Sequence, residues 1–248
     1  EEDNKTANSL GLNNGGIPYY TEHLPTMVKL CADNSKELIA SVAGFSPEEY
    51  QMLANFCRSF GVKVVELNFG CPNVWGGGCQ KPIVSEHPVL MRHILELLRP
   101  TDGIIVRNSW VKLSPLMPGM LVEIAGILWR FPYLLGAVAC NTFPNGYALN
   151  ENGNPAIFGK NLAGIAGDGL LEIAAGQVAQ LSKLLPPEQL VKGAGGICSG
   201  RAMYTHIMAG ANAVQIGSHL YANGAGVFGQ VLEEYTELVG RWGDPTNR

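Results

Sequence analysis

Charge is scarce in this sequence. Of its 248 residues, only 15% are Asp, Glu, Lys or Arg, and the formal net charge is -4. A nucleic-acid-binding protein needs a basic surface for the phosphates, so nucleic acid is not expected as a partner. Long apolar runs are missing too, because Glu123, Arg130 and Pro132 interrupt the most apolar region, residues 120–140. A spanning helix needs about 20 predominantly apolar residues, so no membrane span is expected.

Motifs for metals and dinucleotides are also missing. The six cysteines are scattered without a Cys-x-x-Cys pair, and the five histidines do not cluster, so no zinc site is indicated. No Gly-x-Gly-x-x-Gly follows a strand and opens a helix, which argues against a Rossmann-type NAD site. Scattered cysteines in a long apolar chain favour a reducing compartment, and we expect a cytoplasmic protein.

Short apolar segments alternate with helix-like segments along the whole chain, and apolar residues make up 46% of it. The predicted strands are residues 38–44, 63–68, 103–114, 134–141, 190–196 and 213–217. The predicted helices are residues 21–31, 46–60, 85–98, 117–129, 169–185, 200–209 and 226–241. Residues 1–16 and 142–168 are predicted to be irregular. Strands that alternate with helices indicate an α/β fold with a parallel sheet, either open and doubly wound or a (β/α)8 barrel lacking two units.

Residues 61–78 are the most informative stretch. A Val- and Leu-rich strand is followed by Asn68, Gly70, Cys71 and Asn73, and then by three glycines at 76–78. Carboxamides donate and accept hydrogen bonds, which suits a ligand edged with C=O and N–H groups, and a thiol can exchange a proton. The alternative is that Cys71 is a packed side chain in an ordinary turn. The glycine loop is either a surface loop or a lid that opens for substrate.

Polar or glycine residues lie at or just after the carboxyl ends of five successive predicted strands. They are Asn68 and Cys71, Lys112, Asn141 and Thr142, Gly195 and Gly196, and Gly217 and Ser218. Parallel α/β folds carry their sites at the carboxyl ends of strands, so these residues are expected at one rim. Glycine backbone after the last two strands can hold a phosphate, although tight turning would also explain it. A mononucleotide cofactor fits this pattern better than NAD.

Six motifs, in this order along nearly the whole chain, resemble the dihydroorotate dehydrogenases. They are Asn-Ser-Leu-Gly-Leu at 8–12, Leu-Asn-Phe-Gly-Cys-Pro-Asn at 67–73, Val-Lys-Leu-Ser-Pro at 111–115, Cys-Asn-Thr at 140–142, Gly-Ala-Gly-Gly-Ile at 193–197 and Val-Gln-Ile-Gly-Ser at 214–218. The cysteine at 71 resembles the soluble class 1 enzymes, since the membrane-bound class has serine there. Dihydropyrimidine dehydrogenase shares related motifs within a much larger chain.

The resemblance implies a (β/α)8 TIM barrel, here one domain over residues 1–248, that binds FMN and oxidises (S)-dihydroorotate to orotate in pyrimidine biosynthesis. Cys71 would take the C5 proton, and the C6 hydride would pass to flavin N5. The implied substrate contacts are Asn8, Asn68, Asn73, Asn141 and Thr142. The implied flavin and phosphate contacts are Lys112, Asn68, Gly167, Gly195, Gly196, Gly217 and Ser218. For Lys112, an ion pair with Glu66 is the alternative.

The resemblance also implies a homodimer and an electron acceptor, which is fumarate, NAD through a partner subunit, or another oxidant. The chain departs from the family in three ways. Two β/α units are missing before Asn8, so an incomplete barrel is expected, and Gly70 replaces the usual serine. In addition, residues 75–87 do not match the fumarate-using pattern well, and the segment at 107–110 is unusual. The alternatives are a flavoprotein acting on another pyrimidine and a non-catalytic flavin- or pyrimidine-binding relative.

Overall fold

A parallel sheet of six strands forms the centre of the molecule. The computed structural model describes residues 5–76, 79–100, 108–157 and 162–247. From one edge to the other the strands are β2 (Ile39–Val42), β3 (Val64–Asn68), β6 (Ser109–Leu113), β7 (Leu134–Ala139), β10 (Leu190–Ala194) and β11 (Ala213–Gln215). Each strand of this sheet pairs in parallel with the one before it, so the order never reverses. A doubly wound sheet reverses its strand order, whereas a barrel does not. The sheet is therefore part of a (β/α)8 barrel.

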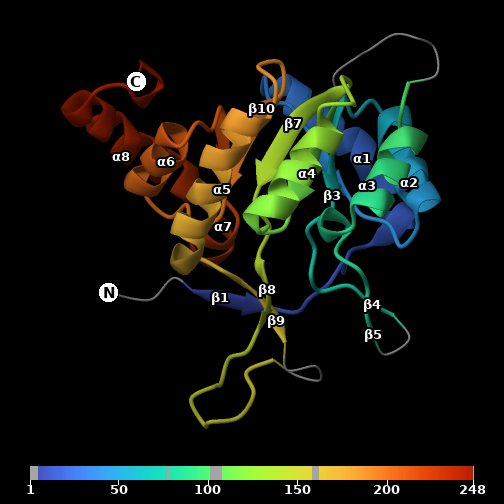
Figure 1. The fold of residues 1–248 in the computed structure, drawn as a ribbon, viewed down its shortest axis with the longest axis horizontal. Helices are drawn as coiled ribbons and strands as arrows, with labels where there is room; N and C mark the ends of the chain where they lie inside the picture. Colours follow the sequence, from blue (N-terminus) through green and yellow to red (C-terminus); the bar gives the residue numbers. More distant parts are fainter. Residues whose placement is uncertain (1–4, 77–78, 101–107, 158–161, 248) are drawn as a thin grey trace.

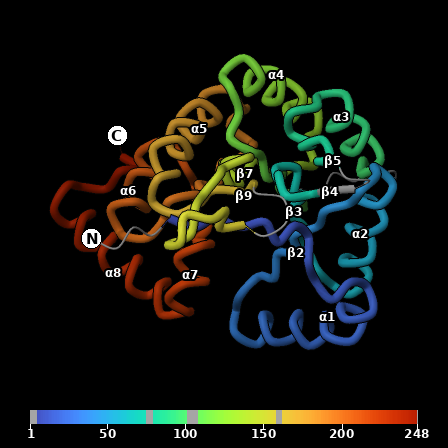
Figure 2. The backbone as a smooth tube through the Cα atoms, turned by 90° about the horizontal axis from the view of Figure 1, so that it is seen from below, coloured from blue at the N-terminus to red at the C-terminus, as the bar shows by residue number. Residues whose placement is uncertain are grey.

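The helices lie outside the curled sheet. They are α1 (Gly16–Asp33), α2 (Pro47–Ser59), α3 (Pro88–Leu97), α4 (Pro118–Leu128), α5 (Leu171–Leu184), α6 (Gly200–Met208), α7 (Ser218–Asn223) and α8 (Val227–Trp242), with 3-10 turns at Val84–Glu86, Asp168–Leu170 and Pro245–Asn247. Figure 2 shows them as an arc around the strands that is open between α1 and α7. Helix α2 starts as the sequence predicts, because Ser46 Oγ accepts a hydrogen bond from the Glu49 backbone N–H at 3.2 Å. Within the described ranges, no helix is long and apolar enough to cross a membrane.

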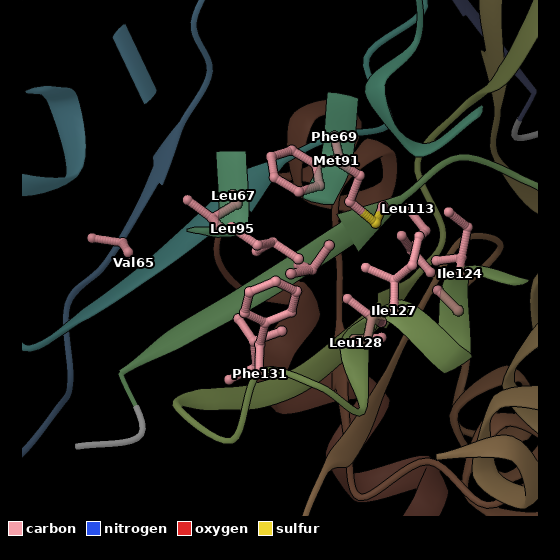
Figure 3. Close-up of a cluster of buried hydrophobic side chains, with 14 of the residues drawn as sticks. Val65, Leu67, Phe69, Met91, Leu95, Leu113, Ile124, Ile127, Leu128 and Phe131 are labelled. Atoms are coloured by element: carbon pink, nitrogen blue, oxygen red, sulfur yellow. The ribbon is translucent and has the colours of Figure 1, made fainter. Parts of the chain in front are cut away.

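The core lies between the sheet and these helices. Figure 3 shows part of this core, a cluster in which Leu67 of β3 and Leu113 of β6 lie near Met91 of α3. Val65 of β3 and Leu128 of α4 belong to the same cluster, and all five side chains are buried. Successive side chains of a strand point to opposite faces. Because the odd-numbered residues of β3 face the helices, its even-numbered residues face the barrel interior.

A second, antiparallel sheet corrects the sequence prediction. The segments at 1–16 and 142–168 were predicted to be irregular, but they contain β1 (Thr6–Asn8), β8 (Phe143–Gly146) and β9 (Ala163–Ala166), which pair in the order β1-β9-β8. These short strands lack an alternating apolar pattern, and β1 pairs with a segment far along the chain. The small sheet lies below the barrel sheet in Figure 1. The hairpin of β4 (Trp75–Gly76) and β5 (Cys79–Gln80) and helix α7 were also not predicted.

Gly70 marks a close approach between the ends of two strands. A Cβ atom built on Gly70 would lie 2.5 Å from the backbone nitrogen of Ser114 and 2.6 Å from the carbonyl carbon of Leu113. Because both atoms belong to the backbone, a side-chain rotation cannot relieve the clash. Only glycine fits between the β3 loop and β6 here, which explains why serine does not occupy this position.

We predict that Gly70→Ala destabilises the protein, whereas Gly126→Ala stabilises it. The first change forces two strand ends apart, which should lower the free energy of unfolding by about 1–3 kcal/mol. Gly126 lies exposed in α4 with no described atom within 4 Å of its Cβ position, so the better helix propensity of alanine should add up to about 1 kcal/mol. Urea denaturation followed by circular dichroism measures both, and equal midpoints would contradict the packing argument.

Candidate active site at the barrel mouth

The carboxyl ends of five barrel strands meet at one rim. A pocket there is lined by Lys112 from β6, by the loops after β7 and β10, and by the loop after β11. Its predicted site residues are Lys112, Asn141, Thr142, Gly195, Gly196, Gly217 and Ser218. We call it the rim pocket. Asn68 and Cys71 line a neighbouring pocket, here the thiol pocket. Gly167 lines a third, here the outer pocket, which shares Gly196, Ile197 and Ser218 with the rim pocket.

Two asparagines link the thiol pocket to the rim pocket. The Nδ2 atom of Asn141 donates a hydrogen bond to Oδ1 of Asn68 at 2.9 Å, and Oδ1 of Asn141 accepts one from the Thr142 backbone N–H at 2.8 Å. The hydroxyl of Tyr50 donates to the backbone carbonyl of Asn68 at 2.9 Å. Both amides are therefore held in orientation, with the NH2 end of Asn68 as the side that a ligand would meet.

The other two predicted asparagines form a separate pair. Nδ2 of Asn73 donates to the backbone carbonyl of Asn8 at 2.8 Å and lies 3.2 Å from Asn8 Oδ1. This contact ties β1 to the Cys71 loop. Among the described residues that line the three pockets, Asn8 and Asn73 do not occur. The structure thus brings them to the edge of the site rather than into these pockets.

Two free thiols lie near the rim, and their surroundings differ. Burial raises the pKa of Cys71, while the Asn73 backbone N–H and the Lys112 ammonium act weakly in the opposite direction. Burial raises the pKa of Cys140 to about 12, and this side chain is only 3% exposed. The positive charge of Lys112 favours the thiolate of both residues, but only Cys71 is half-buried and has a backbone N–H that helps to ionise it. Of these two, Cys71 is better suited to accept a proton.

Lys112 has a polar environment inside the barrel. Its Nζ atom lies 3.8 Å from Oε1 of Glu66 and 3.4 Å from Oε1 of Gln215. The two hypotheses for Lys112 are therefore compatible, because the ammonium group pairs with Glu66 and its residue still lines the rim pocket. The sequence analysis missed Gln215. Gln215 could have been identified from its position, because it precedes Gly217 by two residues at the end of a strand and faces the barrel interior.

The glycine loops expose backbone to the pockets. Gly195 and Gly196 have φ values of +114° and +71°, a region that favours glycine. A Cβ atom on Gly196 would clash with Leu171 at 2.6 Å, and one on Gly195 would make a tight contact of 3.1 Å with Leu170. His206 Nε2 lies 2.9 Å from the carbonyl oxygen of Gly195 and holds this loop from the fully buried side. At Gly217, by contrast, no described atom lies within 4 Å of the Cβ position. The backbone is therefore accessible at this point.

The outer pocket contains polar residues that the sequence analysis did not select. It is lined by Lys5, Asp168, Cys198 and His219. Within the described part of the chain, the buried atoms Asp168 Oδ1 and His219 Nε2 have no hydrogen-bond partner. Such atoms are costly unless a ligand or water pairs with them, so the outer pocket is suited to a polar ligand. In the same described ranges, no group of three or more His, Cys, Asp or Glu residues could hold a metal ion.

Two sequence hypotheses fall on residues outside the described ranges. The glycine loop at 76–78 includes Gly77 and Gly78, and the unusual segment at 107–110 includes Arg107. The lid role of that glycine loop stays a prediction.

Comparison with known proteins identifies the family. A sequence model described as dihydroorotate dehydrogenase matches residues 1–239. Dihydroorotate dehydrogenase (fumarate) from Lachancea kluyveri is 33% identical over 241 residues, and that from Trypanosoma cruzi is 30% identical over 243. Each alignment covers 95% of this chain and 74% of the relative. Ligand-free dihydroorotate dehydrogenase from Eimeria tenella has the same fold, with a TM-score of 0.75 at 17% identity over 98% of this chain and 72% of that one. The chain therefore belongs to class 1 of the dihydroorotate dehydrogenase family and is an oxidoreductase.

Proposed function

We propose that this protein oxidises dihydroorotate to orotate, with FMN in the rim pocket and Cys71 as the base. The observation that carries the proposal is the hydrogen bond between Asn68 and Asn141. Asn68 shares its pocket with the thiol, and Asn141 shares its pocket with Lys112 and the glycine loops. A substrate bound at this amide pair would have a proton acceptor and the cofactor pocket both within reach.

The residues of the rim and outer pockets fit FMN. The two pockets share Gly196, Ile197 and Ser218, so together they extend from Lys112 to His219. Open backbone at Gly217 suits a phosphate, and the unpartnered Asp168 Oδ1 suits a hydroxyl donor such as the ribityl chain. When bound, FMN accepts the hydride that the substrate loses. The glycines would hold the phosphate end and Lys112 the ring end.

The amides account for recognition of the substrate. Dihydroorotate has a ring edged with amide groups, and each carboxamide of the protein can both donate and accept a hydrogen bond. Asn68 and Asn141 are already oriented by their mutual contact, so little ordering is needed on binding. A site that pairs these groups discriminates against analogues that lack them, since its polar atoms would be left unpaired.

Cys71 provides the proton acceptor for the C5 position. Its thiolate is stabilised by the Asn73 backbone N–H and by the positive charge of Lys112, although burial outweighs both. Gly70 contributes no hydroxyl beside it. Proton removal therefore depends on how much of Cys71 is ionised at the working pH.

The first prediction from the proposed function concerns the visible spectrum. The purified protein should show flavin bands that bleach without oxygen when dihydroorotate is added. Cys71→Ala should keep the flavin and be reduced about 100 to 10,000 times more slowly, because the general base is missing. Cys79→Ala, which removes an exposed thiol, is the control and should behave like the parent protein.

Stopped-flow absorbance measures these rates. A yellow protein that bleaches with another dihydropyrimidine but not with dihydroorotate would mean that the enzyme acts on that other pyrimidine. A yellow protein that no dihydropyrimidine bleaches would mean a binding protein, and a colourless protein would contradict the FMN proposal.

The second prediction is an alkaline pH dependence. Because burial raises the pKa of Cys71 above its ordinary value of 9.0, the neutral thiol predominates at pH 7. The active form is the thiolate, so the rate of flavin reduction should rise about tenfold per pH unit until that pKa is passed. Lys112→Met should move the profile to higher pH, since it removes a charge that favours the thiolate. A flat profile between pH 6 and 9 would exclude Cys71 as the base.

The third prediction separates cofactor binding from folding. Because Gly217 has open space at its Cβ position, Gly217→Leu should fold while its side chain fills the rim pocket. FMN affinity, measured by quenching of flavin fluorescence, should fall at least about tenfold, the equivalent of 1.4 kcal/mol. Gly229→Leu adds the same side chain to an open position on α8 and should not change it. Unchanged affinity in Gly217→Leu would place FMN elsewhere.

A further inference from the structure

Three polar side chains from three different strands meet inside the barrel. Glu66 comes from β3, Lys112 from the neighbouring β6, and Gln215 from β11. Strands β6, β7 and β10 separate β3 from β11 in the sheet. Nevertheless, Nε2 of Gln215 donates a hydrogen bond to Oε2 of Glu66 at 2.5 Å, directly across the interior. Lys112 Nζ lies 3.8 Å from Glu66 and 3.4 Å from Gln215, so the three close a triangle.

The chemistry of the three groups determines how Gln215 is oriented. A carboxylate only accepts hydrogen bonds and an ammonium group only donates them. The NH2 end of Gln215 must therefore face Glu66, and its carbonyl end must face Lys112. A glutamate or a methionine at position 215 could not satisfy both neighbours in this way. Gln215 is thus a connector that holds the cation and the anion in fixed positions.

The triangle is largely removed from water. The side chains of Glu66 and Lys112 are 6% and 24% exposed. Lys192 from β10 is a further cation in the same interior, and its Nζ atom lies 4.0 Å from the centroid of the Trp110 ring. Charges screened so little by solvent act on each other over several ångströms. Gln215 and Lys112 line the rim pocket, whereas Glu66 is not among its described lining residues.

We propose that Glu66 and Gln215 are positioning residues that set the reduction potential of the flavin. Gln215 fixes Lys112 beside the rim pocket, and the Glu66 carboxylate offsets part of its positive charge. A reduced flavin carries more negative charge than an oxidised one, so a nearby cation stabilises it and a nearby anion destabilises it. The potential then depends on a carboxylate that does not touch the cofactor. This inference rests on the proposed binding of FMN in the rim pocket.

Two isosteric substitutions that change the charge of the triangle in opposite directions test the proposal. Glu66→Gln removes a negative charge and should make the midpoint potential of bound FMN more positive. Gln215→Glu adds a negative charge and should make it more negative. Each change should alter the ratio of reduced to oxidised flavin at least about tenfold, or about 30 mV for a two-electron couple. Equilibration with a reference dye in the absence of oxygen measures these potentials.

The control is Glu96→Gln. It also removes a carboxylate paired with a cation, but the Glu96–Arg99 pair lies on the surface of α3 with both side chains about half exposed. Its potential should equal that of the parent protein. If the triangle had only a structural role, both test variants would weaken its contacts in the same way. The two potentials would then shift in the same direction or not at all, and either result would overturn the proposal.

Three further outcomes are distinguishable. If Glu66→Gln does not fold, comparison of Gln215→Glu with Gln215→Met separates charge from contact, and equal potentials in these variants would overturn the proposal. If the parent protein retains no flavin after addition of FMN, the proposed function fails, and this inference fails with it. A protein that binds FMN with the same potential in every variant would refute only the role of Glu66 and Gln215.

Discussion

The alternation of side chains along parallel strands is the constraint on which the rest of this structure depends. On β3, Val65 and Leu67 face the helices and are fully buried, while Glu66 and Asn68 face the interior and the rim. A shift of one residue would exchange these sets and place a carboxylate in the apolar core. The packing that stabilises the fold therefore also determines which residues reach the site.

The interior of the barrel contains charge that an apolar core would not tolerate. The side chain of Glu66 is only 6% exposed, and removal of a carboxylate from water is costly unless it is paired and hydrogen-bonded. Lys112 provides the counter-charge and Gln215 the hydrogen bond. Replacement of a buried ion pair by well-packed apolar residues is often neutral or stabilising. We therefore explain the triangle of Glu66, Lys112 and Gln215 by its proposed effect on the rim pocket rather than by a gain in stability. Fold and proposed chemistry thus meet in the same three side chains.

The surroundings of Cys71 have opposing effects on its ionisation. Burial removes a thiol from water, and this raises its pKa. Full burial, as at Cys140, would leave the thiol neutral at any physiological pH. Cys71 is partly exposed and has a backbone N–H and a cation near it, which counter the effect of burial. The tight contact of Gly70 with β6 determines where this loop leaves the strand.

Local sequence patterns were sufficient to predict much of this protein. The six barrel strands and most of their helices could be located because apolar periodicity and caps such as Ser46 are properties of neighbouring residues. The residues at the carboxyl ends of the strands, among them Asn68, Lys112 and Asn141, could be grouped for the same reason. Parallel strands bring their carboxyl ends to one edge whatever their order.

Tertiary structure alone decided the remaining features. No local pattern encodes strand order, which distinguishes a partial barrel from an open sheet; the family resemblance implied the barrel, and the strand order confirms it. The sheet of β1, β9 and β8 brings Asn8 to Asn73 through pairing of segments far apart in the chain. The bond from Gln215 to Glu66 joins residues 149 positions apart. Such contacts depend on which surfaces meet after the chain has folded. Local sequence therefore determined which residues lie at the strand ends, and the fold determined which of these residues contact one another.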